Sequence, residues 1–243
     1  MTKPTILAID TATGACSAAV LARGALAARR QAIMERGHAE ALIPMVEAVM
    51  AEAGLAYAAL DAVAVTVGPG AFTGVRIGLS AARGIGLAAG IPVVGATTLE
   101  ALARGVPLAE RAGATVVAAI ESKRADLYVQ SFDAACAPAG APAAMLPEAL
   151  AEALAGALAE GPLVLAGDGA ARAYEALGEA PGRADRVTLA SSARHPDPGV
   201  LAALAAERLA AAGAAGMALQ PATPLYLRPP DAKVPASGGR LRP

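Results

Sequence analysis

The sequence predicts an α/β fold of two related subdomains, each a mixed β-sheet with flanking helices. Short apolar runs alternate with segments of helical periodicity and with Gly- and Pro-containing turns, which is typical of a compact α/β protein. Two stretches of the first half recur in the same order in the second half, which indicates a duplicated unit. The 243 residues suit one large domain or two small ones and are enough to bury a core.

The first half is expected to open with a β-hairpin and to continue with alternating helices and strands. ILAID is a short apolar run, TATGA supplies turn residues, and CSAAVL is extended again. In GHAEALIPMVEAVMAEAG the apolar residues follow helical spacing; Gly54 suits the C-terminal cap, and Pro44 predicts an irregularity in the first turn. Thr97 or Thr98 is the expected N-cap of a later helix. The expected elements are strand–turn–strand over 5–31, helix over 37–54, strand over 60–67, helix over 73–89, strand over 91–94 and helix over 97–104.

The second half repeats this order. AID followed by CSAAVL corresponds to AIE followed by LYVQSF at a constant offset of 111 residues, so that Glu121 stands where Asp10 stands in the first half. VTVGPG later corresponds to VLAGDG at a shorter offset, with the helix LPEALAEALAGAL between. A helix from about Pro198 to Ala212 and an extended PLYLR are expected to follow. We therefore divide the chain into an N-terminal subdomain (1–104), a C-terminal subdomain (105–228) whose last helix is expected to pack back on the first, and a mobile Pro/Gly-rich tail (229–243).

Composition and charge exclude several classes of function. The formal net charge is −1 with a pI near 6.1, so there is no overall basic footprint for a polynucleotide. Trp is absent and aromatic residues make up only 2%, which argues against stacking platforms for single-stranded nucleic acid. Cys16 and Cys136 show no motif spacing, and we expect a cytoplasmic protein without signal peptide or membrane span.

The stretch GPGAFTGVRIG connects a predicted strand to a predicted helix and allows two interpretations. In the first, exposed amides, the helix dipole and one cation bind a phosphate through Gly68, Gly70, Thr73 and Arg76. In the second, which we favour, the glycines make a tight turn, Phe72 packs as a large anchor, and small residues such as Gly74 and Gly78 allow close helix packing. The turn Gly167-Asp168-Gly169 has the same two interpretations.

The duplicated unit of strand hairpin, helix, strand and glycine turn resembles the actin, sugar kinase and Hsp70 ATPase superfamily. Within it IDTATGACSAAV, RGHAEALIPMV, VGPGAFTGVRIGLSAARGIGLA and PLYLR together resemble the TsaB family of bacterial tRNA threonylcarbamoyladenosine biosynthesis proteins. The resemblance implies a protein that acts with its paralogue TsaD and the ATPase TsaE, which together transfer a threonylcarbamoyl group from its adenylate to N6 of adenosine 37. The tRNAs concerned read codons beginning with adenine. It also implies that TsaD carries the metal and the transferase site, and that TsaB binds TsaD through the first two helices of its N-terminal subdomain.

Two candidate ligand residues are tested against this resemblance. TsaD-like proteins hold their metal with an H-x-x-x-H pair on one helix face, but here His38 is followed four residues later by Leu42, so we expect no metal site. The only other histidine, His195, stands in a turn-like segment. Asp10 occupies the position at which kinases of the superfamily place an acidic residue near the phosphates. No second acidic ligand for magnesium is evident, so we expect Asp10 to shape the local turn instead.

The interpretation that follows is a non-catalytic partner subunit of the tRNA-modifying complex. We expect no tightly bound cofactor, with ATP or ADP entering only at the level of the complex, and contact with tRNA only through its partners. The alternative is a stand-alone ATP-dependent small-molecule kinase or nucleotide hydrolase of the same fold. Whether the chain dimerises with itself in the absence of TsaD is left open. The contact with TsaD, or with a second copy, is expected at Leu42, Met45, Val46, Val49, Met50, Ile77 and Arg83, and Glu at position 46 or 50 is expected to block it without unfolding the chain.

Overall fold

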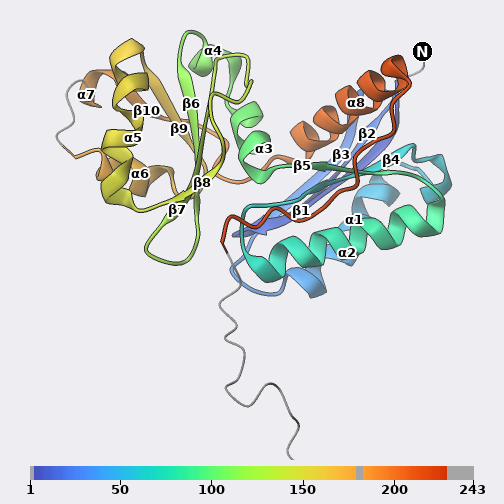
Figure 1. Ribbon diagram of the computed structural model, residues 1–243. Helices are drawn as coiled ribbons and strands as arrows, with labels where there is room; N and C mark the ends of the chain where they lie inside the picture. The colour runs from blue at the N-terminus through green and yellow to red at the C-terminus, as the bar shows by residue number, and fades with distance from the viewer. Residues whose placement is uncertain (1–2, 179–182, 229–243) are drawn as a thin grey trace, which may run out of the picture.

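The computed structural model describes residues 3–178 and 183–228, and these form two five-stranded sheets (Figure 1). The strand orders are β3-β2-β1-β4-β5 and β10-β9-β6-β7-β8. In each sheet three antiparallel strands are extended by two strands that join in parallel. The second sheet therefore repeats the first strand for strand, which confirms the predicted α/β fold with a duplicated mixed sheet.

The first sheet and the elements around it come mainly from the first half of the chain. Its strands are β1 (Ile6–Thr13), β2 (Ala15–Ala22), β3 (Ala25–Ile33), β4 (Ala62–Thr66) and β5 (Val93–Ala96). The helices of this half are α1 (His38–Glu52), the 3₁₀ turn η1 (Tyr57–Ala59), α2 (Phe72–Ala89), α3 (Thr98–Gly105) and α4 (Leu108–Arg111).

The second sheet contains β6 (Thr115–Glu121), β7 (Leu127–Phe132), β8 (Ala143–Met145), β9 (Leu163–Ala166) and β10 (Val187–Leu189). Its helices are α5 (Pro147–Glu160), α6 (Ala170–Ala176) and α7 (Arg183–Arg186), and α8 (Pro198–Ala215) follows. The PLYLR segment forms no strand; it is attached to the first sheet by the Leu225 amide, which donates to the Val67 carbonyl at 2.7 Å. The predicted mobile tail, 229–243, lies outside the described residues.

The N-terminal hairpin contains one strand more than the sequence pattern predicts. Residues 5–31 were expected to hold two strands, but β2 ends at Ala22 and β3 runs antiparallel to it from Ala25. Arg23 and Gly24 form the two-residue connection, both with positive φ (51° and 81°), as the hairpin turn with matching twist requires. The sequence pattern did not predict this turn, because arginine rarely adopts a left-handed backbone conformation.

Helices cover both faces of each sheet. α1 and α2 pack on one face of the first sheet, and α8 packs on its other face (Figure 1). In the second half α5 and α6 cover one face, and α3 covers the other with Leu99 and Leu102. Since β1 is covered on both sides, all its residues are buried, which explains its continuous apolar run. Among the described residues no helix is long and apolar enough to cross a membrane.

The chain therefore exchanges elements between its two halves. α3 belongs to the first half by sequence but packs on β6, whereas α8 belongs to the second half but packs on β1 and β2. A division of the chain near residue 104 separates the two sheets but not the helices that cover them. Both halves contribute to the space between the sheets, and this is where the candidate site lies.

Candidate functional site

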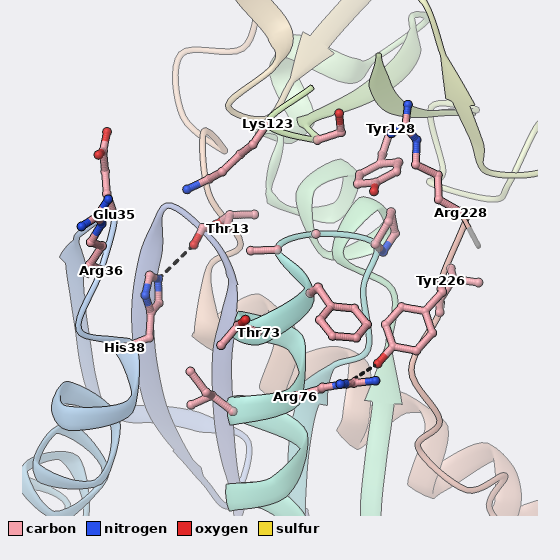
Figure 2. A pocket seen from close by; sticks show the side chains of 18 of the residues that line it. Thr13, Glu35, Arg36, His38, Thr73, Arg76, Lys123, Tyr128, Tyr226 and Arg228 are labelled. Atoms are coloured by element: carbon pink, nitrogen blue, oxygen red, sulfur yellow. Dashed lines mark hydrogen bonds between the residues drawn. The ribbon is translucent and has the colours of Figure 1, made fainter. Parts of the chain in front are cut away.

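A cavity of about 990 Å³ opens between the two halves of the molecule (Figure 2). One wall is formed by the β1–β2 turn at Thr13 and by the first turns of α1 and α2. The loop after β6, at Lys123, lines the cavity from the second half of the chain, and the segment that carries Tyr226 lies against α2. The N-cap residues of α1 and α2, Gly37 and Ala71, make no side-chain capping hydrogen bond, so both helix ends present backbone donors in this region. The cavity thus combines polar backbone, cationic side chains and aromatic rings from five segments of the chain.

The predicted nucleotide-binding residues are divided by the structure. Gly70, Thr73 and Arg76 line the cavity, as does Ile77 of the predicted partner contact. The others lie deeper or further away and do not line it; they are Asp10, Gly68, Gly167, Asp168 and Gly169. The phosphate-binding interpretation of the two glycine turns therefore remains a prediction, and the residues assigned to it do not share one open surface.

Asp10 is a buried structural group at the end of the straight part of β1. Its side chain has no exposed surface, and its Oδ1 atom accepts hydrogen bonds from the Thr66 hydroxyl (2.6 Å) and the Ala12 amide (3.1 Å). Burial raises the pKa of Asp10 from 3.8 to about 6, against the opposing effect of the two hydrogen bonds. The bond to Ala12, two residues on, is the local turn contact expected of an aspartate here.

Asp168 supplies an acidic neighbour to Asp10 that the sequence did not reveal. Asp168 stands just after β9, whereas Asp10 lies within β1. The Asp168 Oδ1 atom accepts a hydrogen bond from the Glu121 amide at 3.0 Å. Burial raises the pKa of Asp168, and its charge also contributes to the raised pKa of Asp10. Glu121 itself pairs with Arg172 at 2.8 Å. The two aspartates are thus close enough to interact electrostatically, but each is already hydrogen-bonded within its own half.

Thr13 brings both histidines of the chain to one point. The His38 Nε2 atom donates to the Thr13 carbonyl at 3.1 Å (Figure 2), and His195 Nδ1 lies 3.1 Å from the Thr13 hydroxyl. Burial lowers the pKa of His195, so the neutral ring is favoured at that contact. The sequence had placed His195 in an unassigned turn; only the fold brings it to the β1–β2 hairpin.

The residues around His38 do not fit a metal ion. The position one helical turn beyond His38 is held by Leu42, which is 1% exposed and packed in the core. One of the two His38 ring nitrogens, Nε2, is engaged by the Thr13 carbonyl. In the described part of the chain no group of three His, Cys, Asp or Glu side chains comes together as a metal site requires.

The glycines of GPGAFTGVRIG allow α2 to lie directly on strand β1. A Cβ atom at Gly70 would stand 2.2 Å from the Ala12 carbonyl oxygen, and one at Gly74 would stand 2.1 Å from that of Thr11. The Thr11 hydroxyl completes this contact by donating to the Gly74 carbonyl at 2.7 Å. The favoured interpretation, close packing, agrees with this geometry, although the neighbour is a strand rather than another helix.

Phe72 does not anchor the core as the sequence suggested. Its side chain is 49% exposed and lies beside the Tyr226 ring, with 5.3 Å between ring centroids. The core beneath α2 is filled by Val75 and Leu79 instead, because these residues lie on the helix face turned to the sheet. In the sequence Tyr226 belongs to the PLYLR motif, and no local pattern places it against α2.

The predicted partner contact needs revision in its choice of side chains. Leu42, Val46, Val49 and Met50 are 0–3% exposed and belong to the core beneath α1, so they are not available to a partner. Arg83 donates to the Ala222 carbonyl at 2.6 Å. The large apolar side chain that α1 exposes is Ile43, at 44%, while Met45 and Ile77 are partly buried. The expectation that Glu at position 46 or 50 spares the fold is therefore wrong, because it would place a charge in the core.

Comparison with known proteins gives the family. The TsaD family, described as tRNA N6-adenosine threonylcarbamoyltransferase, matches residues 31–235. The Escherichia coli protein named tRNA threonylcarbamoyladenosine biosynthesis protein TsaB is 40% identical over 124 residues, and the match spans about half of each chain (51% of this one and 52% of the relative).

Solved structures agree with this assignment. YeaZ from Pseudomonas aeruginosa is 32% identical, with a TM-score of 0.73 over 92% of this chain and 100% of that one. The ROK hexokinase from Thermus thermophilus is 17% identical, with a TM-score of 0.50 over 84% of this chain and 99% of that one, and shows the shared sugar kinase-like fold alone. The chain belongs to the TsaD family and, within it, to the TsaB (YeaZ) proteins that its motifs resemble.

Proposed function

We propose that this chain is a partner subunit, without a transferase centre of its own, for the threonylcarbamoylation of N6 of adenosine 37 in tRNAs that read codons beginning with adenine. The names of its relatives support a place in threonylcarbamoyladenosine biosynthesis. TsaD is the proposed direct partner and TsaE acts through the complex. In this proposal ATP or ADP is used by the complex, and the chain holds no cofactor tightly.

The observation that carries the non-catalytic assignment is the replacement of a ligand by a core residue. Leu42 occupies the helical position at which a second metal-binding histidine would be needed, and it is packed against the sheet. Asp10 is likewise bonded to Thr66 and Ala12 and does not line the cavity. Both features favour a role in assembly over a role in turnover.

The experiment mixes the purified chain with TsaD and follows complex formation by size-exclusion chromatography with light scattering. We expect a stable complex, and we expect threonylcarbamoyladenosine formation to require the chain in addition to TsaD and TsaE. The same measurement on the chain alone reports whether it forms a homodimer. Robust ATP turnover by the isolated chain, abolished by Asp10→Ala, would instead establish the stand-alone kinase or hydrolase.

The contact surface is tested with exposed residues. Ile43→Glu on α1 is expected to weaken the complex with TsaD at least tenfold while leaving the melting temperature close to that of the wild type, since Ile43 is 44% exposed. Leu189→Glu, at 48% exposure on β10, is the matched control and should bind normally. Equal binding by both variants would place the contact elsewhere on the molecule.

A further inference from the structure

The cavity gathers aromatic side chains in a chain that has very few of them. The sequence contains four tyrosines, two phenylalanines and no tryptophan. Phe72, Tyr128 and Tyr226 all line this cavity, so half of the aromatic residues meet at one place. Phe72 and Tyr226 remain 49% and 43% exposed. An exposed aromatic cluster at a cavity is a feature of ligand sites rather than of cores, and average composition does not reveal it.

Arg76 holds the two exposed rings in place. Its guanidinium lies 3.6 Å from the centre of the Phe72 ring, and its Nε atom donates to the Tyr226 hydroxyl at 2.9 Å (Figure 2). The Tyr226 segment is fixed in turn by the Leu225 amide bond to Val67. The rings therefore form a pre-organised surface on which a flat group can stack at little cost in side-chain entropy.

The charge of the cavity is positive although that of the chain is not. Five cationic side chains and two glutamates line the cavity, and one of the five, Arg228, is paired with the buried Asp126 carboxylate. The lining still carries an excess of positive charge, whereas the whole chain has a formal net charge of −1. Lys123 projects into the cavity from the loop after β6 (Figure 2), and its ammonium forms no hydrogen bond or ion pair with the described residues. Its backbone is left-handed, with φ of 60°, a conformation uncommon outside glycine and enriched at ligand sites.

We propose that this cavity binds an unpaired nucleotide of a single-stranded RNA segment, with the base stacked at Tyr226 and Phe72 and a phosphate beside Lys123. Exposed rings next to cations are the means by which proteins hold single-stranded nucleic acid. The inference rests on the proposed function only for the source of the RNA. It replaces the expectation that the chain meets tRNA only through its partners.

The cavity suits a nucleotide of a strand better than a free nucleoside triphosphate. A triphosphate is normally bound as its magnesium complex, which requires carboxylate ligands near the phosphates. Asp10 and Asp168 do not line the cavity, and each is bonded within its own half of the molecule. A nucleotide within a strand carries a single phosphate charge, for which Lys123, unpaired among the described residues, is an adequate partner.

The test measures binding of a short, unstructured, fluorescently labelled RNA to the full chain by fluorescence anisotropy at several salt concentrations, with and without TsaD. Tyr226→Ala is expected to weaken binding about 5-fold to 150-fold, the range of losses for one stacked base. Lys123→Gln should weaken binding and reduce the slope of log affinity against log salt by about 0.7, as the loss of one single-strand phosphate contact requires.

Matched controls separate this site from general effects. Tyr57→Ala removes an aromatic ring of 37% exposure outside the cavity, and Arg23→Gln removes a cation that also has a left-handed backbone, with φ of 51°. Both variants should bind RNA as the wild type does. Tyr226→Phe keeps the ring without its hydroxyl and should retain binding. The melting temperature of Tyr226→Ala shows whether a loss of binding in that variant is a failure to fold.

Several outcomes would overturn the proposal. The first is that the RNA binds neither to the chain alone nor to the chain with TsaD, and the second is that the wild type and the cavity variants bind it equally. The third is that AMP displaces the RNA at the same nucleotide concentration as unlabelled RNA does, which would identify a site for free nucleotides. Displacement of the RNA by an acidic peptide at lower concentration would identify a protein ligand instead. Complex formation with TsaD is measured on the same variants, so a failure of RNA binding with an intact complex contradicts this inference and leaves the proposed function standing.

Discussion

Replacing Asp10 by asparagine tests whether this carboxyl is a buried structural group. In the folded protein burial raises its pKa from 3.8 to about 6, so between these values the folded state binds more protons than the unfolded state. Stability from this group is therefore fully present below about pH 3.8 and is lost as the pH rises through about 6. A shift of about two pH units corresponds to roughly 3 kcal/mol.

The asparagine side chain cannot ionise but keeps an oxygen that can accept from Thr66 and Ala12, the two donors to the aspartate. We expect the free energy of unfolding of Asp10→Asn, minus that of the wild type, to increase by roughly 2.5 kcal/mol between about pH 4 and about pH 7. Most other titrating groups are common to both proteins and cancel in this difference. Urea denaturation followed by circular dichroism across this range gives the two curves.

Asp10→Ala is the companion variant. It also removes the ionisation, so its difference from the wild type should have the same pH dependence, but at a lower absolute stability because the Thr66 hydroxyl and the Ala12 amide lose their acceptor. A difference between Asp10→Asn and the wild type that is flat or decreases with pH would refute the reasoning. It would mean that the carboxylate is stabilised in the folded state, as expected for a charged ligand-binding group.

Three further predictions concern packing and ion pairs. Gly74→Ala should destabilise the fold by about 1–3 kcal/mol in thermal or urea unfolding, since the new Cβ atom would stand 2.1 Å from the Thr11 oxygen. In the same helix Gly84→Ala, with no atom within 4 Å of the added Cβ, should stabilise by about 0.5–1 kcal/mol, and a loss there would contradict the packing argument. Arg228→Gln removes the ion-pair partner, at 2.5 Å, of the buried Asp126 carboxylate and should lower the free energy of unfolding by about 1–3 kcal/mol. Arg30→Gln breaks the exposed pair with Glu52 and should lower it by less than about 1 kcal/mol.

Local pattern was sufficient for most elements of the fold. Helical spacing predicted α1, α2 and α5, and the Thr97 hydroxyl caps α3 by accepting from the Glu100 amide, as one of two expected residues. The turn at Arg23 and Gly24 was missed because neither a typical turn pair nor a change of hydrophobic period marks it. The sequence pattern also could not predict which apolar residues of α1 are buried and which are exposed, because the exposed Ile43 is as apolar as the buried Val46.

The sequence by itself determined the duplicated α/β fold, the family, and the loss of a second histidine at Leu42, because each depends on residue types at fixed spacing along the chain. The tertiary structure alone decided which side chains meet. It brings Tyr226 to Arg76 across 150 residues of sequence, joins His38 and His195 at Thr13, and places Lys123 and three aromatic rings at one cavity. Such contacts are set by how the two sheets and the returning C-terminal segment pack, and packing between distant segments leaves no periodic trace in the sequence.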